Sequence, residues 1–436
     1  MSWSTHATSD LISDAVLEIG DGYRAKNAEM STDGVPFVRA GDVNGRVNTV
    51  GTDLLSTASV ARVGRKRSMA GDVVMTTKGT IGRLAFVKVG DPEFIYSPQL
   101  CYWRSLDRNK IEPRWLFYAM RSQEMANQIS WSAGQTDMAP YVSLTDQRTA
   151  FKITLPPIYE QRNIAAMLGA LDDKIELNRR MSATLEEMAR ALYRSWFVDF
   201  DPVHARALGQ PPAHMDPTTA ALFPDSFAPD GLPKGWEAGT LSHLIEFNPK
   251  ERLPKGTAAP YLEMKALPTS GMSADAPYLR EFTSGTKFRE RDTLLARITP
   301  CLENGKTAVV DDLLGSEVGW GSTEFIVMRA KPGVSAALPY CIARDPDFRA
   351  EAIQTMTGSS GRQRADARRI SELDMAIAPA PVHTAFSDLV CPMLDRVIAA
   401  GQEARNLAAL RGALLPRLMS GELRIREAEK QVEEVV

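Results

Sequence analysis

Residues 155–200 read LPPIYEQRNIAAMLGALDDKIELNRRMSATLEEMARALYRSWFVDF. This stretch decides the fold, because two prolines end a short β-like segment and a long helical pattern follows them. Between Glu160 and Phe197 apolar residues recur at intervals of four and three, interrupted at Asn178 and Ser182. The apolar positions are Ile164, Leu168, Leu171, Ile175, Leu185, Leu192 and Trp196. The pattern predicts a helix with one apolar seam of the coiled-coil type.

A second long helix is predicted from Thr384 to Ser420, with Gly421 where a helix C-terminus is expected. Its apolar positions are Leu394, Val397, Ala404, Leu407, Leu410, Leu414 and Leu418. Two helices that each carry one apolar face most simply bury those faces against each other. At the seam, Asn178 either fixes the register of the pair or marks an exposed polar gap, and the sequence favours neither.

The chain contains an internal repeat with an offset of about 223 residues. The coincident pairs are Gly82/Gly305, Ala85/Ala308, Val87/Val310, Arg121/Arg344, Pro156/Pro379, Leu171/Leu394, Asp172/Asp395 and Ile175/Ile398. In each half, short β-rich runs lead to a short helix, residues 113–129 or 338–356, and then to a last strand that ends in proline. We therefore expect two similar α+β domains, each followed by a long helix.

The β-rich runs are expected at residues 72–75, 84–87 and 94–96 in the first half and at 293–296, 307–310 and 325–328 in the second. Residues 201–233 contain seven prolines, which exclude a long helix or a central strand there. We expect this segment to be a linker that lies on the surface. The acid-rich tail after Arg426 is expected to be frayed.

The composition is that of a soluble globular protein, with 436 residues, 44% of them hydrophobic, and a net charge of −3. A basic field over the whole protein is therefore absent, and nucleic-acid binding must rely on local basic patches. The four cysteines form no C-x-x-C pair, which argues against a zinc ribbon or a disulfide framework. The scattered cysteines fit a reducing compartment, and we expect a cytoplasmic protein. No run of about 18 apolar residues is present, so we expect no membrane span.

Motifs of the common enzyme sites are missing from the sequence. There is no G-x-x-x-x-G-K-[ST] loop, no G-x-G-x-x-G at a strand–helix junction and no H-x-x-x-H spacing. One fragment, Glu263-Met264-Lys265, is similar to the second half of a PD-(D/E)xK nuclease site. A surface Glu/Lys pair on alternating strand positions is the simpler interpretation, and we expect a chain without catalytic or metal-binding residues.

Basic residues gather where loops are expected in both halves. Cationic loops suit phosphate contacts, and Arg and Gln side chains read guanine and adenine edges in the major groove. Residues 132–136 and 358–364 occupy equivalent places, and each offers Gly and Gln. The candidate DNA-binding residues are Arg65, Lys66, Arg67, Lys78, Arg83 and Gln135 in the first half, and Arg297, Lys306, Arg362, Gln363, Arg364 and Arg368 in the second.

With these features in hand, the sequence resembles the specificity subunit of a type I restriction–modification system. The residues that carry the resemblance lie in five stretches: 155–158 (LPPI), 160–165 (EQRNIA), 171–178 (LDDKIELN), 195–200 (SWFVDF) and 414–423 (LLPRLMSGEL). The start of the second half, Leu232-Pro-Lys-Gly-Trp236, is also similar to the start of a recognition domain in that family. The first half lacks such a start, and Pro381-Val-His-Thr-Ala departs from the usual entry to the second helix.

The resemblance implies an α+β fold of two target-recognition domains separated by two long antiparallel coiled-coil helices, with a pseudo-twofold repeat. The implied boundaries are 1–155 for recognition domain 1, 156–200 for the first spacer helix, 201–232 for the linker, 233–378 for recognition domain 2, 379–424 for the second spacer helix and 425–436 for the tail. It also implies that each domain reads one half of a split site in double-stranded DNA.

The implied partners are two modification (methyltransferase) subunits, which bind the spacer helices, and restriction subunits, which translocate and cleave DNA. S-adenosylmethionine for adenine-N6 methylation, and ATP and Mg²⁺ for restriction, are then expected on those partners and not on this chain. The residues expected at the subunit and helix interface are Ile164, Leu168, Leu171, Ile175, Leu185, Leu192, Leu394, Leu407 and Leu414.

Two other functions remain open at this point. The chain could be the recognition portion of a self-contained restriction endonuclease, with Glu263 and Lys265 as remnants of the nuclease site, and it would then cleave DNA with a metal ion. It could instead be a coiled-coil scaffold, whose DNA binding would ignore sequence.

Overall fold

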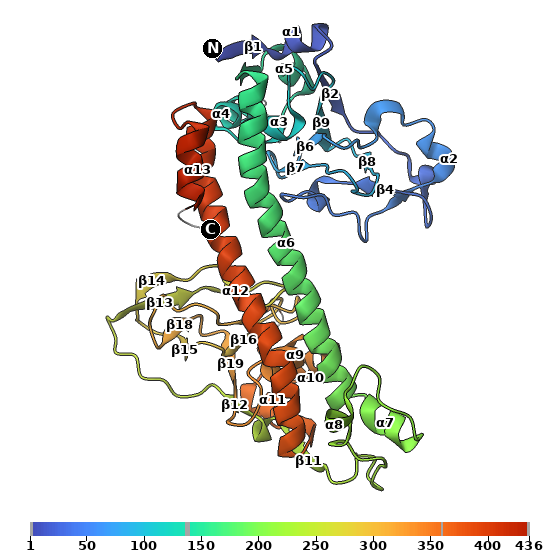
Figure 1. Ribbon diagram of the computed structural model, residues 1–436, viewed down its shortest axis with the longest axis vertical. Helices are drawn as coiled ribbons and strands as arrows, with labels where there is room; N and C mark the ends of the chain where they lie inside the picture. Colours follow the sequence, from blue (N-terminus) through green and yellow to red (C-terminus); the bar gives the residue numbers. More distant parts are fainter. Residues whose placement is uncertain (1–2, 136–139, 359–360, 434–436) are drawn as a thin grey trace. The chain divides into compact units, whose positions relative to one another are not determined.

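The computed structural model describes residues 3–135, 140–358 and 361–433. The chain forms two compact units: unit 1 combines Met1–Lys174 with Asn406–Val436, and unit 2 consists of Ile175–Arg405. Two 40-residue helices, α6 (Ile158–Phe197) and α12 (Ala380–Met419), each begin in one unit and end in the other (Figure 1). Each unit therefore contains a segment of both long helices.

Unit 1 is built on an antiparallel sheet in the order β2-β9-β6-β7. A smaller sheet has the order β3-β5-β4-β8, with β4 and β8 parallel, and β1 pairs with β10. The strands are β1 (Ser4–Ala7), β2 (Leu17–Asp21), β3 (Met30–Ser31), β4 (Val35–Val38), β5 (Leu54–Leu55), β6 (Val73–Thr76), β7 (Leu84–Phe86), β8 (Ile95–Tyr96), β9 (Leu100–Ser105) and β10 (Lys152–Leu155). The helices are α1 (Thr8–Ser13), α2 (Thr57–Val60), α3 (Pro113–Ala119), α4 (Gln123–Ala133), α5 (Leu144–Thr149) and α13 (Ile425–Glu433), with 3-10 turns η1 (Asn27–Glu29), η2 (Ala40–Asp42) and η3 (Gly64–Lys66).

Unit 2 repeats this plan, with a main antiparallel sheet in the order β12-β19-β16-β17. Its second sheet has the order β14-β13-β18-β15, with β13 and β18 parallel, and β11 pairs with β20. The strands are β11 (Glu237–Thr240), β12 (Ile245–Phe247), β13 (Ala258–Leu262), β14 (Tyr278–Glu281), β15 (Thr286–Phe288), β16 (Thr293–Ala296), β17 (Thr307–Val309), β18 (Gly319–Gly321), β19 (Phe325–Ala330) and β20 (Asp374–Ile377). The helices are α7 (Asp201–Ala207), α8 (Pro217–Ala220), α9 (Leu338–Arg344), α10 (Pro346–Gln354) and α11 (Ala367–Ser371), with 3-10 turns η4 (Leu241–His243) and η5 (Met264–Ala266).

The predicted duplication is confirmed by the matching topology of the two main sheets. Strands β6 and β16 hold the same central place, and all four residues of each are buried. A buried carboxylate precedes each strand: Asp72 pairs with Arg104 of β9 at 2.6 Å, and Asp292 pairs with Arg329 of β19 at 2.6 Å. A buried carboxylate is tolerated only when it is paired and hydrogen-bonded. Each unit therefore needs the arginine to keep its buried aspartate stable.

In unit 1 the two long helices contribute fully buried apolar residues. Ile164, Leu168 and Leu171 of α6 are buried, as are Leu407 and Leu414 of α12. Asp172 of α6 forms an ion pair with Arg411 of α12, which joins the two helices across the seam. Helix α6 begins at Ile158, two residues before the expected start, and α12 begins at Ala380, four residues before it.

In unit 2 the seam contains a polar contact. Asn178 exposes only 1% of its surface, and its Nδ2 donates to Glu403 Oε2 of α12 at 2.8 Å. The interpretation of Asn178 as an exposed polar gap is therefore wrong, because its amide is buried and bonded across the two helices. Leu394 is fully buried, whereas Ile175, Leu185 and Leu192 are half-buried.

Each short helix that the sequence predicted is two helices in the structure. In unit 1, α3 ends at Ala119 and Ser122 caps α4, its Oγ accepting from the Met125 N–H. In unit 2, Asp345 caps α10 and Pro346 occupies its first turn. The single-helix prediction failed because Ser and Asp-Pro start a new helix more readily than they continue one.

The proline-rich linker also differs from the expectation of a surface segment. Val203 of α7 and Phe223 are fully buried in the main core of unit 2, where Phe223 packs edge-on against Trp196 at a centroid distance of 5.0 Å. The linker therefore completes the core around the end of α6.

The tail forms helix α13 through Glu433 and is not frayed over that range. In the part of the chain that is described, no helix is both long and apolar enough to cross a membrane.

Candidate nucleic-acid interface

In unit 1, two loops that are far apart in sequence are joined by backbone hydrogen bonds next to the central strand. The Val142 N–H donates to the Thr77 carbonyl at 3.0 Å, and Lys78 and Tyr141 form an antiparallel bridge. Thr77 directly follows β6, and Val142 precedes α5. The loop after β6 is thereby held against the loop between α4 and α5.

Unit 2 has the same junction at the equivalent place. The Ala365 N–H donates to the Arg297 carbonyl at 2.8 Å, and Ile298 and Arg364 form an antiparallel bridge. The Thr299 N–H also donates to the Gln363 carbonyl at 3.0 Å. Three of the residues that the sequence singled out, Arg297, Gln363 and Arg364, are thus brought together. This repeated loop junction is the candidate nucleic-acid interface.

The cations at the unit 1 junction are not neutralised by acids. Lys78 is exposed, with its Nζ 5.9 Å from the centre of the Tyr141 ring, and Arg83 is half-buried. Neither forms an ion pair with another described residue. Such cations are available to phosphate, the commonest partner of Lys and Arg in protein–DNA complexes.

Gln135 is exposed and follows Gly134 at the end of α4. The expected loop at 132–136 is wrong in part, because Ser132 and Ala133 form the last turn of that helix. Ser132 is buried there and donates to Asp146 Oδ2 at 2.7 Å, which fastens α4 to α5. Thr136, and Ser359 and Ser360 of the equivalent loop, lie outside the described residues.

The cations at the unit 2 junction differ in how firmly they are held. Arg362 is exposed without a described ion-pair partner, whereas Arg364 forms a bidentate pair with Glu324 at 2.7–2.9 Å, which raises the pKa of Arg364. Arg297 has a buried Nε without a hydrogen-bond partner among the described residues. Lys306 Nζ donates to the Met264 carbonyl at 2.9 Å. The junction thus offers both fixed and free cations.

Four other candidates lie away from the loop junctions. Arg65 and Lys66 belong to the turn η3 and Arg67 follows it; these residues pair with Glu18, Asp21 and Glu93 at 3.2, 2.8 and 2.5 Å, respectively. Arg368 lies on α11 and faces Glu372 at 3.4 Å, with both side chains largely exposed. Since each of these cations already has a carboxylate partner, their contribution to DNA binding stays a prediction.

Arg344 is the residue that sequence reasoning missed. It lies at the end of α9, buried, and its guanidinium donates to the carbonyls of Gly305 and Thr307 at 2.7 and 2.9 Å and to that of Thr269 at 2.8 Å. It therefore fixes the loop that carries Lys306. The repeat paired this residue with Arg121, but a sequence match does not indicate which carbonyls a side chain will reach.

The nuclease-like fragment is not on alternating strand positions, as the sequence suggested. Strand β13 ends at Leu262, and Lys265 belongs to the turn η5. Lys265 Nζ lies 2.7 Å from Glu263 Oε1, and the Lys265 side chain is 79% exposed. Among the described residues, no group of three or more His, Cys, Asp or Glu is placed to hold a metal ion. The geometry is that of a surface ion pair.

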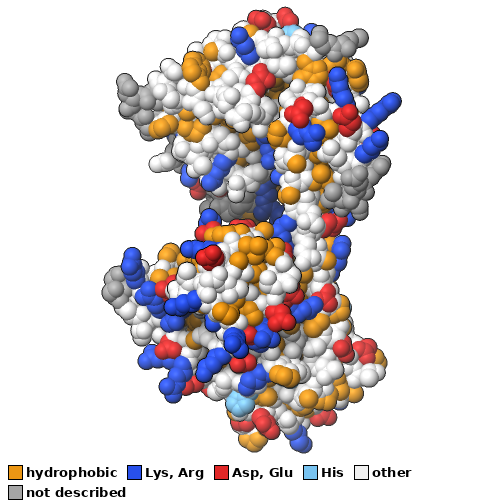
Figure 2. Space-filling view, turned by 90° about the vertical axis from the view of Figure 1, so that its left-hand side faces the viewer, with side chains coloured by type: hydrophobic (Ala, Val, Ile, Leu, Met, Phe, Trp, Pro, Cys, Tyr) orange, Lys and Arg blue, Asp and Glu red, His pale blue; other side chains and the backbone are white. Residues whose placement is uncertain are grey.

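Figure 2 shows many Lys and Arg side chains on the viewed face of the sheet-bearing part of unit 2, with Asp and Glu between them. This distribution agrees with a chain whose net charge is only −3 and whose cations are concentrated locally.

The sequence of this chain is similar to those of several known proteins. Residues 14–187 match the family model for the type I restriction modification DNA specificity domain. The chain is 20% identical to the MjaIX type I specificity subunit of Methanocaldococcus jannaschii over 82% of this chain and 78% of that protein. It is 29% identical to the HindI specificity subunit of Haemophilus influenzae, over 40% of this chain and 38% of that protein.

The fold is also shared with a solved structure. The type I restriction–modification S subunit from M. genitalium superposes with a TM-score of 0.55 at 14% identity, covering 96% of each chain. Taken with the duplicated sheets and the paired helices, this likeness shows that the chain shares the fold of that S subunit, and residues 14–187 resemble a type I restriction modification DNA specificity domain.

Proposed function

We propose that the chain is the DNA-recognition subunit of a type I restriction–modification complex, and that unit 1 and unit 2 each read one half of a split site in double-stranded DNA. The observation that carries this proposal is the loop junction that recurs after β6 and after β16. A junction tied by backbone hydrogen bonds presents its side chains on a preorganised frame, which lowers the entropic cost of binding.

The side chains at the two junctions divide into two kinds of contact. Lys78, Arg83 and Arg362 have no acidic partner among the described residues and suit phosphate oxygens. Gln135 and Gln363 carry amides, which form paired hydrogen bonds with adenine N6 and N7. Different residues in the two units imply different half-site sequences.

We also propose that the long helices bind two modification subunits, which supply S-adenosylmethionine and the adenine-N6 methyltransferase, and that restriction subunits with ATP and Mg²⁺ join this assembly. Support comes from apolar residues that α6 leaves uncovered in unit 2. Leu177 and Met188 are 59% and 46% exposed, and eleven residues are close to three helical turns, so both lie on one face. An exposed apolar face on a helix is typical of a protein interface.

The test is methylation-sensitive sequencing of DNA modified by the reconstituted complex. Lys78→Ala with Gln135→Ala should weaken or relax only the half-site that unit 1 reads, and Arg362→Ala with Gln363→Ala only the other. A lost base contact costs about 1–3 kcal/mol, or roughly a 5- to 150-fold loss of discrimination. Equal loss at both half-sites from either pair of substitutions would show that the units do not read separately.

The matched control is Glu263→Gln with Lys265→Ala, an exposed ion pair of unit 2. These changes should leave methylation and restriction intact. Loss of DNA cleavage in this control alone, with methylation retained, would revive the alternative of a nuclease site in this chain.

A further inference from the structure

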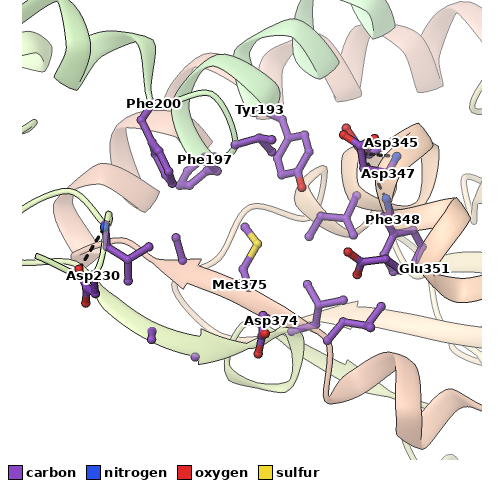
Figure 3. Close-up of a pocket in the computed structure, with 18 residues that line it drawn as sticks. Tyr193, Phe197, Phe200, Asp230, Asp345, Asp347, Phe348, Glu351, Asp374 and Met375 are labelled. Atoms are coloured by element: carbon purple, nitrogen blue, oxygen red, sulfur yellow. Dashed lines mark hydrogen bonds between the residues drawn. The ribbon is translucent and has the colours of Figure 1, made fainter. Parts of the chain in front are cut away.

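Unit 2 contains a cavity of about 520 Å³ beside the C-terminal end of α6. Its walls come from α6, the linker, the strand pair β11–β20 and helix α10 (Figure 3). The volume lies in the range of sites that bind small organic molecules. None of the candidate DNA-binding residues lines it, so the cavity is independent of the proposed recognition of DNA.

The interior of the cavity is aromatic and apolar. Tyr193, Phe197 and Phe200 project from the end of α6 and the residues after it, and Phe348 and Met375 face them from α10 and β20. Aromatic faces carry negative charge density, and they attract cations that come within about 6 Å of the ring centre. A thioether adds a polarisable, adaptable surface.

The charged residues that line the cavity are all acidic. They are Asp230, Asp345, Asp347, Glu351 and Asp374, and no Lys, Arg or His is among the described lining residues. Two of these carboxylates already have a cation, since Arg194 pairs with Asp345 and Asp347 at 3.1 Å. Glu351 and Asp374 are exposed and form no ion pair with another described residue. The cavity therefore has an excess of negative charge that a bound cation would balance.

The hydroxyl of Tyr193 also points into the cavity. Tyr193 exposes only 5% of its surface, and its hydroxyl has no hydrogen-bond partner among the described residues. Figure 3 shows the oxygen directed into the space that Met375 and Glu351 border. Burial raises the pKa of Tyr193, and the Asp345 charge adds to that effect, so the phenol stays neutral and accepts or donates a hydrogen bond. A ligand in the cavity can therefore form a hydrogen bond with this hydroxyl.

We propose that this cavity binds a small organic cation, in which an ammonium group is carried on an aromatic or similarly compact apolar body. The apolar body stacks among Phe197, Phe200 and Phe348, and the ammonium lies toward Glu351 and Asp374. The Tyr193 hydroxyl accepts one of the ammonium protons. An anion, such as a DNA phosphate, is repelled by the same carboxylates.

The experiment is a titration of the full chain with phenethylammonium, followed by ligand-observed NMR. Two probes of nearly the same shape serve as comparisons: phenethyl alcohol, which is neutral, and phenylacetate, which is an anion. We expect phenethylammonium to bind with a Kd of about 1 mM or tighter and the other two at least roughly tenfold more weakly.

Variants locate the site. Tyr193→Phe keeps the ring and removes the hydroxyl, and we expect it to weaken binding roughly fivefold. Glu351→Gln with Asp374→Asn should weaken binding roughly tenfold. The control is Glu281→Gln, an exposed carboxylate on β14 outside the cavity, which should bind like the parent chain. Thermal unfolding curves of all variants verify that the fold is retained.

Three results would overturn the proposal. The first is the absence of phenethylammonium binding to the folded chain. The second is equal binding of phenethyl alcohol, which would show that the carboxylates contribute nothing. The third is parent-like binding by both cavity variants, which would place the amine elsewhere.

Discussion

Arg121 in unit 1 and Arg344 in unit 2 occupy matching places in the repeat, yet the two side chains have different surroundings. Arg344 donates to a set of loop carbonyls and to the Tyr340 hydroxyl, whose own proton goes to Glu186 of α6. Arg121 lies over the Phe117 ring at 5.2 Å and forms no hydrogen bond or ion pair with a described residue, although the charge of Asp172 acts on it. Burial, and after it the charge of Arg411, lowers the pKa of Arg121.

The difference shows what a duplicated fold preserves and what it leaves free to change. Both units keep a buried Asp just before the central strand and pair it with an Arg of the neighbouring strand, Asp72 with Arg104 and Asp292 with Arg329. The arginine at the end of the short helix, in contrast, fixes a loop in unit 2 only. We infer that sheet geometry is shared by the two units and that loop rigidity is set in each unit separately.

The largest expected effect comes from Arg344→Ala. Several buried carbonyls would lose a charged donor, and we expect unit 2 to lose about 3–5 kcal/mol of unfolding free energy. Arg121→Ala removes a single cation–π contact, worth about 0.5–1 kcal/mol in unit 1. Urea unfolding measures both losses, and hydrogen exchange at residues 269–271 and 305–307 reports on the loops that Arg344 holds. Similar losses of unfolding free energy in the two variants would contradict the conclusion that Arg344 fixes the loops of unit 2.

A smaller effect is expected at the seam between the long helices, where unit 1 uses the ion pair of Asp172 and Arg411 and unit 2 uses the Asn178–Glu403 hydrogen bond. Asn178→Ala leaves a small cavity and removes a donor from a partly buried carboxylate, so we expect a loss of about 1–2 kcal/mol. Chemical denaturation of the full chain gives the value. The control Arg180→Ala removes an exposed i,i+4 pair with Glu176 and should cost less than about 0.5 kcal/mol.

If Asn178 fixes register, Asn178→Leu should retain or raise stability while it allows alternative pairings of the helices. Crosslinking between cysteines placed on α6 and α12 within unit 2 detects such pairings. A single crosslinked species for both the parent and the Leu variant would contradict the register role.

The smallest effect concerns pH and is confined to unit 2. Burial raises the pKa of Glu186 above its ordinary value of 4.5, although the Tyr340 hydroxyl, the Met272 amide, Arg344 and Arg190 act against that rise. A carboxyl with a higher pKa in the folded chain binds more protons when folded, so stability falls as pH rises from the unfolded pKa through the folded one. The variant Glu186→Gln should not show this fall in stability with rising pH. Unfolding midpoints between about pH 4 and pH 7 for this variant and for the exposed neighbour control Glu187→Gln test the difference.

The long helices were predicted from sequence to within four residues at each end, because a heptad pattern sustained over many turns leaves few alternatives. The central strands Val73–Thr76 and Thr293–Ala296 were also found, since short apolar runs between Gly and Pro are typical of buried strands. The break at Asp345-Pro346 was missed, although a capping Asp before Pro was a readable signal.

The candidate interface was predicted only in part. Basic and amide residues in repeated loops pointed to Lys78, Gln363 and Arg364, and the structure brings the last two to the loop junction with Arg297. The sequence did not reveal that Glu324 holds Arg364 or that Glu18 holds Arg65. Such pairings depend on which strands lie side by side, and local patterns do not encode that arrangement.

Unit 1 is assembled from both ends of the chain, and this has a consequence for synthesis on the ribosome. Residues 1–174 emerge first, but Leu407, Arg411 and Leu414, which complete their helix seam, belong to Asn406–Val436. The intervening 175–405 take roughly 10–50 s to translate at about 5–20 residues per second. During that interval Asp172 lacks its partner Arg411, whereas unit 2 has all of its sequence by Arg405. The half of the protein whose synthesis begins first is therefore the half that is completed last.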